Sequence, residues 1–369
     1  MATNSAVRPT PFERATPTRP SLFEFPFVWR VSPDADAADR HHLEWAQRFG
    51  LVASPRAIAS LEQVAYGLIT AVIEPGLRGE DLNLVTNWIG WIVTFDDQFD
   101  GPFGDKPHLV AQIMENMIDI LRGKPGAPPH SYHPYEKALG DLMARTQARM
   151  SPAWCERYYN HQASFMTAVS TEMTQRQTSR VWDLDEYLER RYDTIWVRAL
   201  VDLVEISVRY ELPDVINHSW ECATMRKELV FSMSIYNDFY SLPKDITRKD
   251  SHNAIFVLSR LHNMTHEQAM AKLRDLLDQS LARYLAAQAE LPRLFNSLAL
   301  SNIDREGCLR WSTGMDNLWA GINNLHVYHH RYSAETMSKP PAEADLLDYW
   351  DLLPDHKNTT NVLSRNPHT

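Results

Sequence analysis

The chain has 369 residues and a formal net charge of −10, which argues against nucleic-acid binding because such binding needs a basic surface. Hydrophobic residues make up 44% of the chain and aromatic residues 10%, so one large domain with a thick core is expected. The three cysteines, Cys155, Cys222 and Cys308, are odd in number and far apart, which favours reduced, buried thiols in a cytoplasmic protein over disulfides or a zinc site.

The N-terminal segment, residues 1–24, is expected to be an extended arm because prolines recur through it. Its sequence lacks a signal-peptide core, and no apolar run approaches the roughly 18 residues that a membrane span needs. We therefore expect a cytoplasmic location.

From Asp36 onward, apolar residues recur every three or four positions and Pro and Gly cluster between the periodic segments, which predicts helices. The first three helices are expected to begin near Ala37, Pro55 and Asp81, and the second of them to continue at least to Val72. A loop over 122–134 precedes a helix that holds Leu139, and later helices are expected over 154–174, 184–196, 198–209, 215–242, 266–291 and 294–332. Strand signals are weak throughout, so the expected fold class is all-α.

A first cluster of oxygen ligands lies in the run FDDQFD over residues 95–100. Residues in a helix advance by about 100° each, so Asp96 and Asp100 are expected on one face, one turn apart. Trp88 and Ile92 precede them on that face, and an apolar stripe that ends in acids is typical of a pocket with a charged rim. A solvated helix face is the alternative interpretation of such a cluster taken alone.

A second cluster, far downstream, places Asn237, Ser241 and Asp245 at i, i+4 and i+8, again on one helix face. Amide, hydroxyl and carboxylate oxygens are ligands that Mg²⁺ accepts, and Mg²⁺ sites are usually completed by waters and substrate phosphates. The two clusters together therefore predict a divalent-cation site that binds a diphosphate.

Four motifs in register resemble those of bacterial class I terpene synthases, in particular the sesquiterpene cyclases. The run DDQFD over 96–100 is similar to their aspartate-rich motif, and NDFYSLPKD over 237–245 is similar to their Asn/Ser/Glu metal triad. The pair Arg331-Tyr332 resembles their Arg-Tyr pair, and Arg191 stands 46 positions before Asn237, which is the spacing of their diphosphate-sensing arginine. The resemblance covers roughly residues 20–335.

The sequence departs from this family pattern at two places. Asp245 stands where the triad commonly has Glu, and the run 192–196 lacks the small residue that often marks a helix break in the family. Which backbone carbonyl faces the substrate in that run stays open. Arg190 is also a rival to Arg191 by one position.

The resemblance implies an all-α, single-domain class I terpenoid synthase helical bundle around a central active-site cavity. It implies a domain over residues 25–335 and a C-terminal tail over 336–369, as a lid or as a disordered segment. It implies three Mg²⁺ ions, with Mn²⁺ as a substitute, bound by Asp96, Asp100, Asn237, Ser241 and Asp245. The implied diphosphate donors are Arg191, Arg331, Tyr332 and Lys244. The side chains expected to surround the carbocation, each with core packing as the alternative, are Trp88, Ile92, Phe95, Phe99, Trp311, Met315 and Trp319.

The resulting hypothesis is a terpene cyclase. It would ionise a linear prenyl diphosphate, with farnesyl diphosphate as the expected substrate, and cyclise the cation to a sesquiterpene hydrocarbon or alcohol with release of diphosphate. A diterpene cyclase that uses geranylgeranyl diphosphate stays open, because wall residues set the depth of a cavity. The alternative of another class is a non-catalytic helical protein that binds a prenyl diphosphate. A chain-elongating prenyltransferase is disfavoured because those enzymes carry a second aspartate-rich motif, whereas the second motif here is Asn/Ser/Asp. The resemblance also allows a homodimer.

Overall fold

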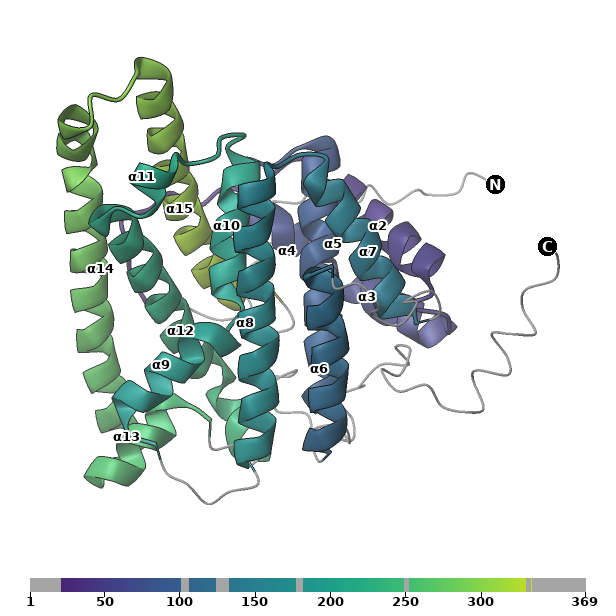
Figure 1. Ribbon diagram of the computed structural model, residues 1–369. Helices are drawn as coiled ribbons and strands as arrows, with labels where there is room; N and C mark the ends of the chain where they lie inside the picture. The colour runs from purple at the N-terminus through teal and green to yellow at the C-terminus, as the bar shows by residue number, and fades with distance from the viewer. Residues whose placement is uncertain are drawn as a thin grey trace, which may run out of the picture.

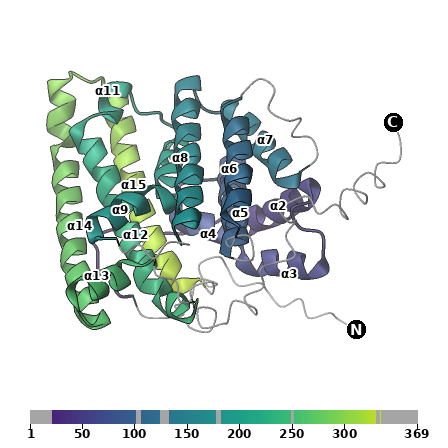
Figure 2. The same cartoon turned by 60° about the horizontal axis from the view of Figure 1, so that its bottom comes forward.

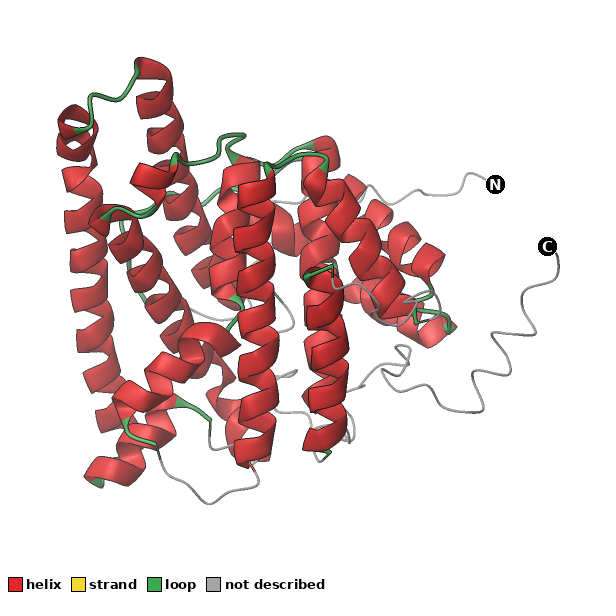
Figure 3. Ribbon diagram, viewed as in Figure 1, coloured by secondary structure: helices red, strands yellow, loops and turns green. Residues whose placement is uncertain are grey.

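The structure, a computed structural model, describes residues 21–100, 106–123, 133–176, 182–248, 252–329 and 333. Within these ranges Figure 3 shows helices joined by loops and no strand, which confirms the all-α prediction. The helices in chain order are α2 (Ala35–Phe49), α3 (Pro55–Val64), α4 (Tyr66–Ile73), α5 (Gly79–Asp96), the 3₁₀ helix η1 (Asp97–Asp100), α6 (Pro107–Leu121), α7 (Pro134–Gln147), α8 (Pro152–Arg176), α9 (Leu184–Thr194), α10 (Val197–Ser207), α11 (Asp214–Asn217), α12 (Trp220–Arg248), α13 (Ala254–His262), α14 (His266–Ser297) and α15 (Asn302–Tyr328).

The helices form a bundle in which segments far apart in the sequence lie side by side. α12 packs along α14, and α6 packs along α8 (Figures 1 and 2). α9 contacts α8, α12 and α13, so the helix that carries Arg191 reaches the helix that carries Asn237. All three cysteines are free and buried, as predicted.

Capping residues explain where several helices begin. Ser54 accepts a hydrogen bond from the backbone N–H of Ala57 ahead of α3, whose first turn contains Pro55. Thr265 and Gln268 form a capping box at the start of α14, so two otherwise unpaired backbone donors are satisfied there.

The prediction of one helix that runs on from Pro55 is wrong, because the chain breaks at Ala65, whose φ is 54°. α4 approaches α2 so closely that a Cβ on Gly67 would lie 2.3 Å from the backbone nitrogen of Asp39. The Asp39 carboxylate also accepts a hydrogen bond from the N–H of Leu68 at 3.2 Å. Local periodicity does not encode these contacts between helices, and they define where α4 begins.

This broken segment, Pro55–Ile73, is the one stretch among the described residues that is long and apolar enough to cross a membrane by length and composition, and 61% of it is buried. Buried helices of a protein core pass the same test, so this is weak support for a membrane span.

Several later helix ends also differ from the prediction. α12 continues through Pro243 and α14 through Pro292, whereas both were expected to stop before these prolines. The segment predicted over 215–242 divides into α11 and α12, and the one predicted over 294–332 is interrupted at Ala299, whose φ is 50°. α6 and α13 were not predicted. The continuation through Pro243 matters most, because it keeps Asp245 on the same helix as Asn237.

Residues 21–29 lie as an extended segment, here called the N-terminal strap, against α12, α14 and α15. The ring centroid of Phe23 lies 4.4 Å from that of Tyr236 and 5.1 Å from that of Phe239, while Phe27 lies 5.7 Å from Tyr284 and from Trp319. The predicted boundaries of arm, domain and tail stay predictions, and residues 1–20 and 336–369 lie outside the described ranges.

Candidate active site

The second predicted ligand cluster lies along one helix, as its spacing predicted, although the helix expected over 215–242 stopped short of Asp245. Asn237, Ser241 and Asp245 follow one another by single turns of α12, and Ser241 Oγ donates a hydrogen bond to Asp245 Oδ2 at 2.6 Å. Ser241 and Asp245 are each only 7% exposed and Asn237 is partly exposed, so the row is best shielded from bulk water at Ser241 and Asp245.

α9 brings the predicted arginine to this row of oxygens. Arg191 Nη2 donates to Asn237 Oδ1 at 2.8 Å and lies 3.6 Å from Asp238 Oδ1. A guanidinium on one helix therefore contacts the first predicted metal ligand on another.

Two buried residues that the sequence analysis missed hold this arginine. The Asp238 carboxylate accepts hydrogen bonds from the Tyr187 hydroxyl at 2.7 Å and from the N–H of Ala254 at 3.0 Å. Burial raises the pKa of Asp238 to about 6, and the charge of Arg191 opposes that shift. The positions of Asp238 beside Asn237 and of Tyr187 one turn before Arg191 are signals that could have identified both.

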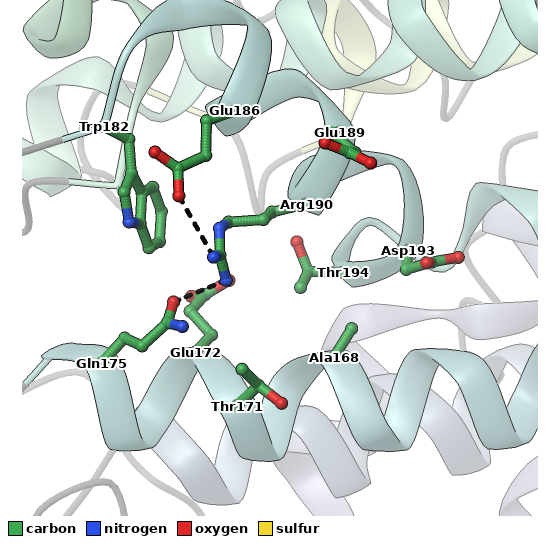
Figure 4. Close-up of a pocket in the computed structure, with 10 residues that line it drawn as sticks. All are labelled: Ala168, Thr171, Glu172, Gln175, Trp182, Glu186, Glu189, Arg190, Asp193 and Thr194. Atoms are coloured by element: carbon green, nitrogen blue, oxygen red, sulfur yellow. Dashed lines mark hydrogen bonds and ion pairs between the residues drawn. The ribbon is translucent and has the colours of Figure 1, made fainter.

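Arg190, the rival to Arg191, lines a different region. It lines a pocket of about 370 Å³ between α8 and α9, and Figure 4 shows its side chain among the other residues that line this pocket. Its guanidinium donates to Gln175 Oε1 at 2.7 Å and to Glu186 Oε1 at 3.2 Å, and lies 5.0 Å from the ring centroid of Trp182. None of the side chains predicted to surround the carbocation lines this pocket, so it is not the predicted cavity.

The first predicted cluster lies where α5 changes its helical geometry. The α-helix ends at Asp96, and Asp97–Asp100 continues as a 3₁₀ helix, which has three residues per turn instead of 3.6. The α-helical spacing assumed for Asp96 and Asp100 therefore stops at Asp96. Asp96 is exposed and Asp97 partly exposed, whereas the side chain of Asp100 lies outside the described part of the structure.

The apolar side chains predicted to surround the carbocation are all buried, namely Trp88, Ile92, Phe95, Phe99, Trp311, Met315 and Trp319. Several make the contacts of a packed core. The Trp88 indole N–H donates to Thr146 Oγ1 at 2.9 Å, and the Phe95 ring stacks on Trp91 with centroids 5.2 Å apart. These contacts are accounted for by core packing, which is the alternative role of each residue. Their role as the wall of a cavity stays a prediction.

The remaining predicted donors are Lys244, Arg331 and Tyr332. Lys244 lies on α12 between Ser241 and Asp245 and is partly exposed. Arg331 and Tyr332 follow the end of α15 and lie outside the described residues, so their roles stay predictions.

The donor set on α12 suits a hard divalent cation, which prefers carboxylate, amide and hydroxyl oxygens. His, Cys, Asp and Glu side chains alone form no group of three or more that could hold a metal ion in the described ranges; the predicted set, however, also uses Asn and Ser oxygens. Asn237 Oδ1 accepts a hydrogen bond from Arg191, and its two lone pairs allow an amide oxygen to accept one hydrogen bond and also bind a cation. A cation there would repel the guanidinium of Arg191, and a diphosphate would give that guanidinium another acceptor.

Comparisons with known proteins point to the same chemistry. Residues 87–283 match the sequence model of a family described as terpene synthase family 2, C-terminal metal binding. Pentalenene synthase of Streptomyces avermitilis is 30% identical over 317 residues, which cover 85% of this chain and 93% of the relative. A (−)-β-caryophyllene synthase of Saccharothrix espanaensis, described as cyclising (2E,6E)-farnesyl diphosphate, is 27% identical over 287 residues, or 78% of this chain and 81% of the relative. The crystal structure of germacradien-4-ol synthase from Streptomyces citricolor superposes with a TM-score of 0.72 at 25% identity, covering 86% of this chain and 99% of the other.

Proposed function

Because this chain belongs to terpene synthase family 2, we propose that it is a class I terpene cyclase that converts farnesyl diphosphate to a sesquiterpene hydrocarbon or alcohol. The observation that carries the proposal is the hydrogen bond from Arg191 to Asn237, because it places a cation suited to diphosphate beside the predicted metal ligands. The choice of substrate is supported by the relative that cyclises farnesyl diphosphate. Dependence on a divalent metal agrees with the metal-binding description of the family.

The ligands are proposed to come from two helices. Asn237, Ser241 and Asp245 would hold a cation from α12, and Asp96 and Asp100 would hold cations from the end of α5. Bound Mg²⁺, proposed as three ions, or Mn²⁺ in its place, supplies the Lewis acidity that neutralises the diphosphate leaving group. The hydrogen bond from Ser241 orients the Asp245 carboxylate.

Arg191 is proposed to change partners when substrate binds. Its planar guanidinium can donate two parallel hydrogen bonds to phosphate oxygens and keeps its charge. The donor that now contacts Asn237 Oδ1 would move to the diphosphate and leave this oxygen for a cation. The buried Asp238 carboxylate, 3.6 Å away, keeps the guanidinium in reach. Lys244, Arg331 and Tyr332 are proposed as further donors.

Apolar side chains near the first cluster are proposed to receive the carbocation. Aromatic faces stabilise cations, and the exclusion of water prevents early quenching. Phe95 and Phe99, on either side of Asp96, meet edge to face with centroids 5.2 Å apart, and the proposed wall includes both.

A cytoplasmic location fits the free, buried cysteines, and a homodimer is retained as a proposal.

The decisive experiment incubates the purified protein with Mg²⁺ and, separately, geranyl, farnesyl and geranylgeranyl diphosphate. Gas chromatography–mass spectrometry of a hexane extract is expected to show a cyclic sesquiterpene from farnesyl diphosphate alone. A diterpene from geranylgeranyl diphosphate would instead support the longer substrate. The absence of product from all three, with the protein shown to be folded, would favour a non-catalytic binding protein.

A further inference from the structure

Asn253 connects the C-terminal part of α12 to the start of α13. It is fully buried, and its Nδ2 donates to Asp245 Oδ2 at 2.9 Å and to the backbone carbonyl of Asp238 at 2.8 Å. Its Oδ1 accepts from the N–H of Ile255 at 2.9 Å. These partners define the orientation of the amide, because a carboxylate and a carbonyl only accept whereas a backbone N–H only donates.

Both bonds that Nδ2 donates go to residues of the candidate site. Asp245 is the last predicted metal ligand on α12, and Asp238 pairs with Arg191. Pro243, which lies between them inside α12, has no backbone N–H and removes one hydrogen bond from the helix. The carbonyl that loses this partner is that of Phe239, and Asn253 donates to the neighbouring carbonyl of Asp238, so Asn253 adds a side-chain hydrogen bond to α12 next to that position.

We propose that Asn253 is a positioning residue that orients the Asp245 carboxylate for divalent-cation binding, an inference that rests on the proposed function. Asp245 Oδ2 accepts one hydrogen bond from Ser241 within α12 and another from Asn253 outside it, so two segments together fix the rotation of the carboxylate. A carboxylate that has lost one of these bonds rotates more freely, and it has to give up this freedom when the cation binds. Removal of such supporting bonds typically weakens metal binding about 10- to 100-fold.

The positioning role is separable from the role of Asn253 as N-cap of α13. The cap uses Oδ1, whereas positioning uses Nδ2. Asn253→Ser keeps an oxygen that can cap the helix and replaces the amide NH₂, which makes both donated bonds, by a shorter hydroxyl that has a single donor. Asn253→Thr does the same with a larger side chain and serves if the serine variant does not fold. Thr265→Ala removes the N-cap of α14 and is the matched control for lost helix stability.

The test measures Mg²⁺ binding in the presence of inorganic diphosphate by isothermal titration calorimetry, together with thermal unfolding of each full-length variant. We expect Asn253→Ser and Asn253→Thr to bind Mg²⁺ about tenfold or more weakly than wild type, and Thr265→Ala to bind it normally although it unfolds at lower temperature. Asp245→Ala is the reference for a lost ligand.

Two other outcomes separate this inference from the proposed function. If both Asn253 variants bind as wild type while Asp245→Ala binds weakly, the positioning role is overturned and the metal assignment stands. If wild type and Asp245→Ala bind Mg²⁺ alike, or neither binds it, Asp245 holds no cation. The positioning role and the metal assignment are then both overturned.

Discussion

Arg190 and Arg191 are adjacent in the sequence but contact different parts of the molecule. Successive residues of a helix differ by about 100° in direction, so Arg191 reaches Asn237 on α12 while Arg190 contacts Gln175 on α8. Sequence spacing indicated Arg191 but left Arg190 as a rival, because spacing alone does not show which of these two side chains faces α12. The packing of α9 between α8 and α12 defines it.

We therefore expect Arg191→Ala to lower kcat/KM for farnesyl diphosphate about 100-fold or more, since each hydrogen bond to a charged group contributes about 1.5–3 kcal/mol. Arg190→Ala should lower it less than about fivefold, because its contacts lie in the pocket between α8 and α9. Steady-state kinetics at saturating Mg²⁺ measures both. A larger loss in Arg190→Ala would transfer the diphosphate contact to Arg190.

A second prediction at this scale concerns the ligands themselves. Asn237→Ala and Asp96→Ala should abolish or nearly abolish turnover, because each removes an oxygen expected to bind a cation. Asp100→Ala should be milder, since Asp100 ends a 3₁₀ helix and does not continue the α-helical face of Asp96. Product formation from farnesyl diphosphate with Mg²⁺ present is the measurement. Full activity of Asn237→Ala would contradict the assignment of the α12 ligands.

At the scale of helices, the sequence predicted what local periodicity encodes. The shared face of Asn237, Ser241 and Asp245 followed from spacing, because residues four apart share a helix face, although the helix predicted over 215–242 stopped short of Asp245. The break at Ala65 and the passage of α12 through Pro243 were not predictable in this way. Gly67 packs against the backbone of α2, and Asn253 supports α12 from a separate segment. Both contacts come from outside the helix concerned, and local periodicity does not encode them.

The N-terminal strap gives a prediction for an element rather than a site. Phe23 packs against Tyr236 and Phe239, the rings on either side of Asn237 and Asp238. We expect Phe23→Ala to lower the free energy of unfolding by about 1–3 kcal/mol, because it removes a partly buried ring that packs against α12.

Urea denaturation followed by circular dichroism measures this change. Val28→Ala is the matched control from the same strap, since Val28 is 66% exposed and its loss should change stability by less than about 0.5 kcal/mol. Equal stability of Phe23→Ala and wild type would show that the strap does not support α12.

At the scale of the whole molecule, the composition and periodicity predicted an all-helical fold with buried thiols, but not the location of a cavity. An apolar stripe predicts that a helix face is buried, whereas it does not say what lies opposite. Trp88 illustrates this limit: it is fully buried, as expected, and its indole pairs with Thr146 on α7. Only the assembled bundle distinguishes a packed side chain from one that lines a cavity.

The assembled bundle also buries a carboxyl group whose titration should affect global stability. Glu74, at the end of α4, is 0% exposed, and burial raises its pKa from 4.5 to about 8. The folded state therefore retains a proton that the unfolded chain releases above about pH 4.5. The contribution of this retained proton to the free energy of unfolding is fully present below that pH, and it is lost as the pH rises through the pKa of Glu74 in the folded state.

We accordingly expect the free energy of unfolding of wild type to fall, relative to that of Glu74→Gln, by up to about 1.4 kcal/mol per pH unit across this window. Glutamine keeps a neutral side chain of similar shape, so it removes the titration and little else. Urea denaturation at several pH values between about 5 and 8 measures the difference. Glu62→Gln, at an exposed position of α3, controls for the change of one surface charge. If Glu74→Gln and wild type follow parallel stability curves over this range, the carboxyl group of Glu74 ionises in the folded state as easily as in the unfolded chain, and its burial carries no linkage to folding.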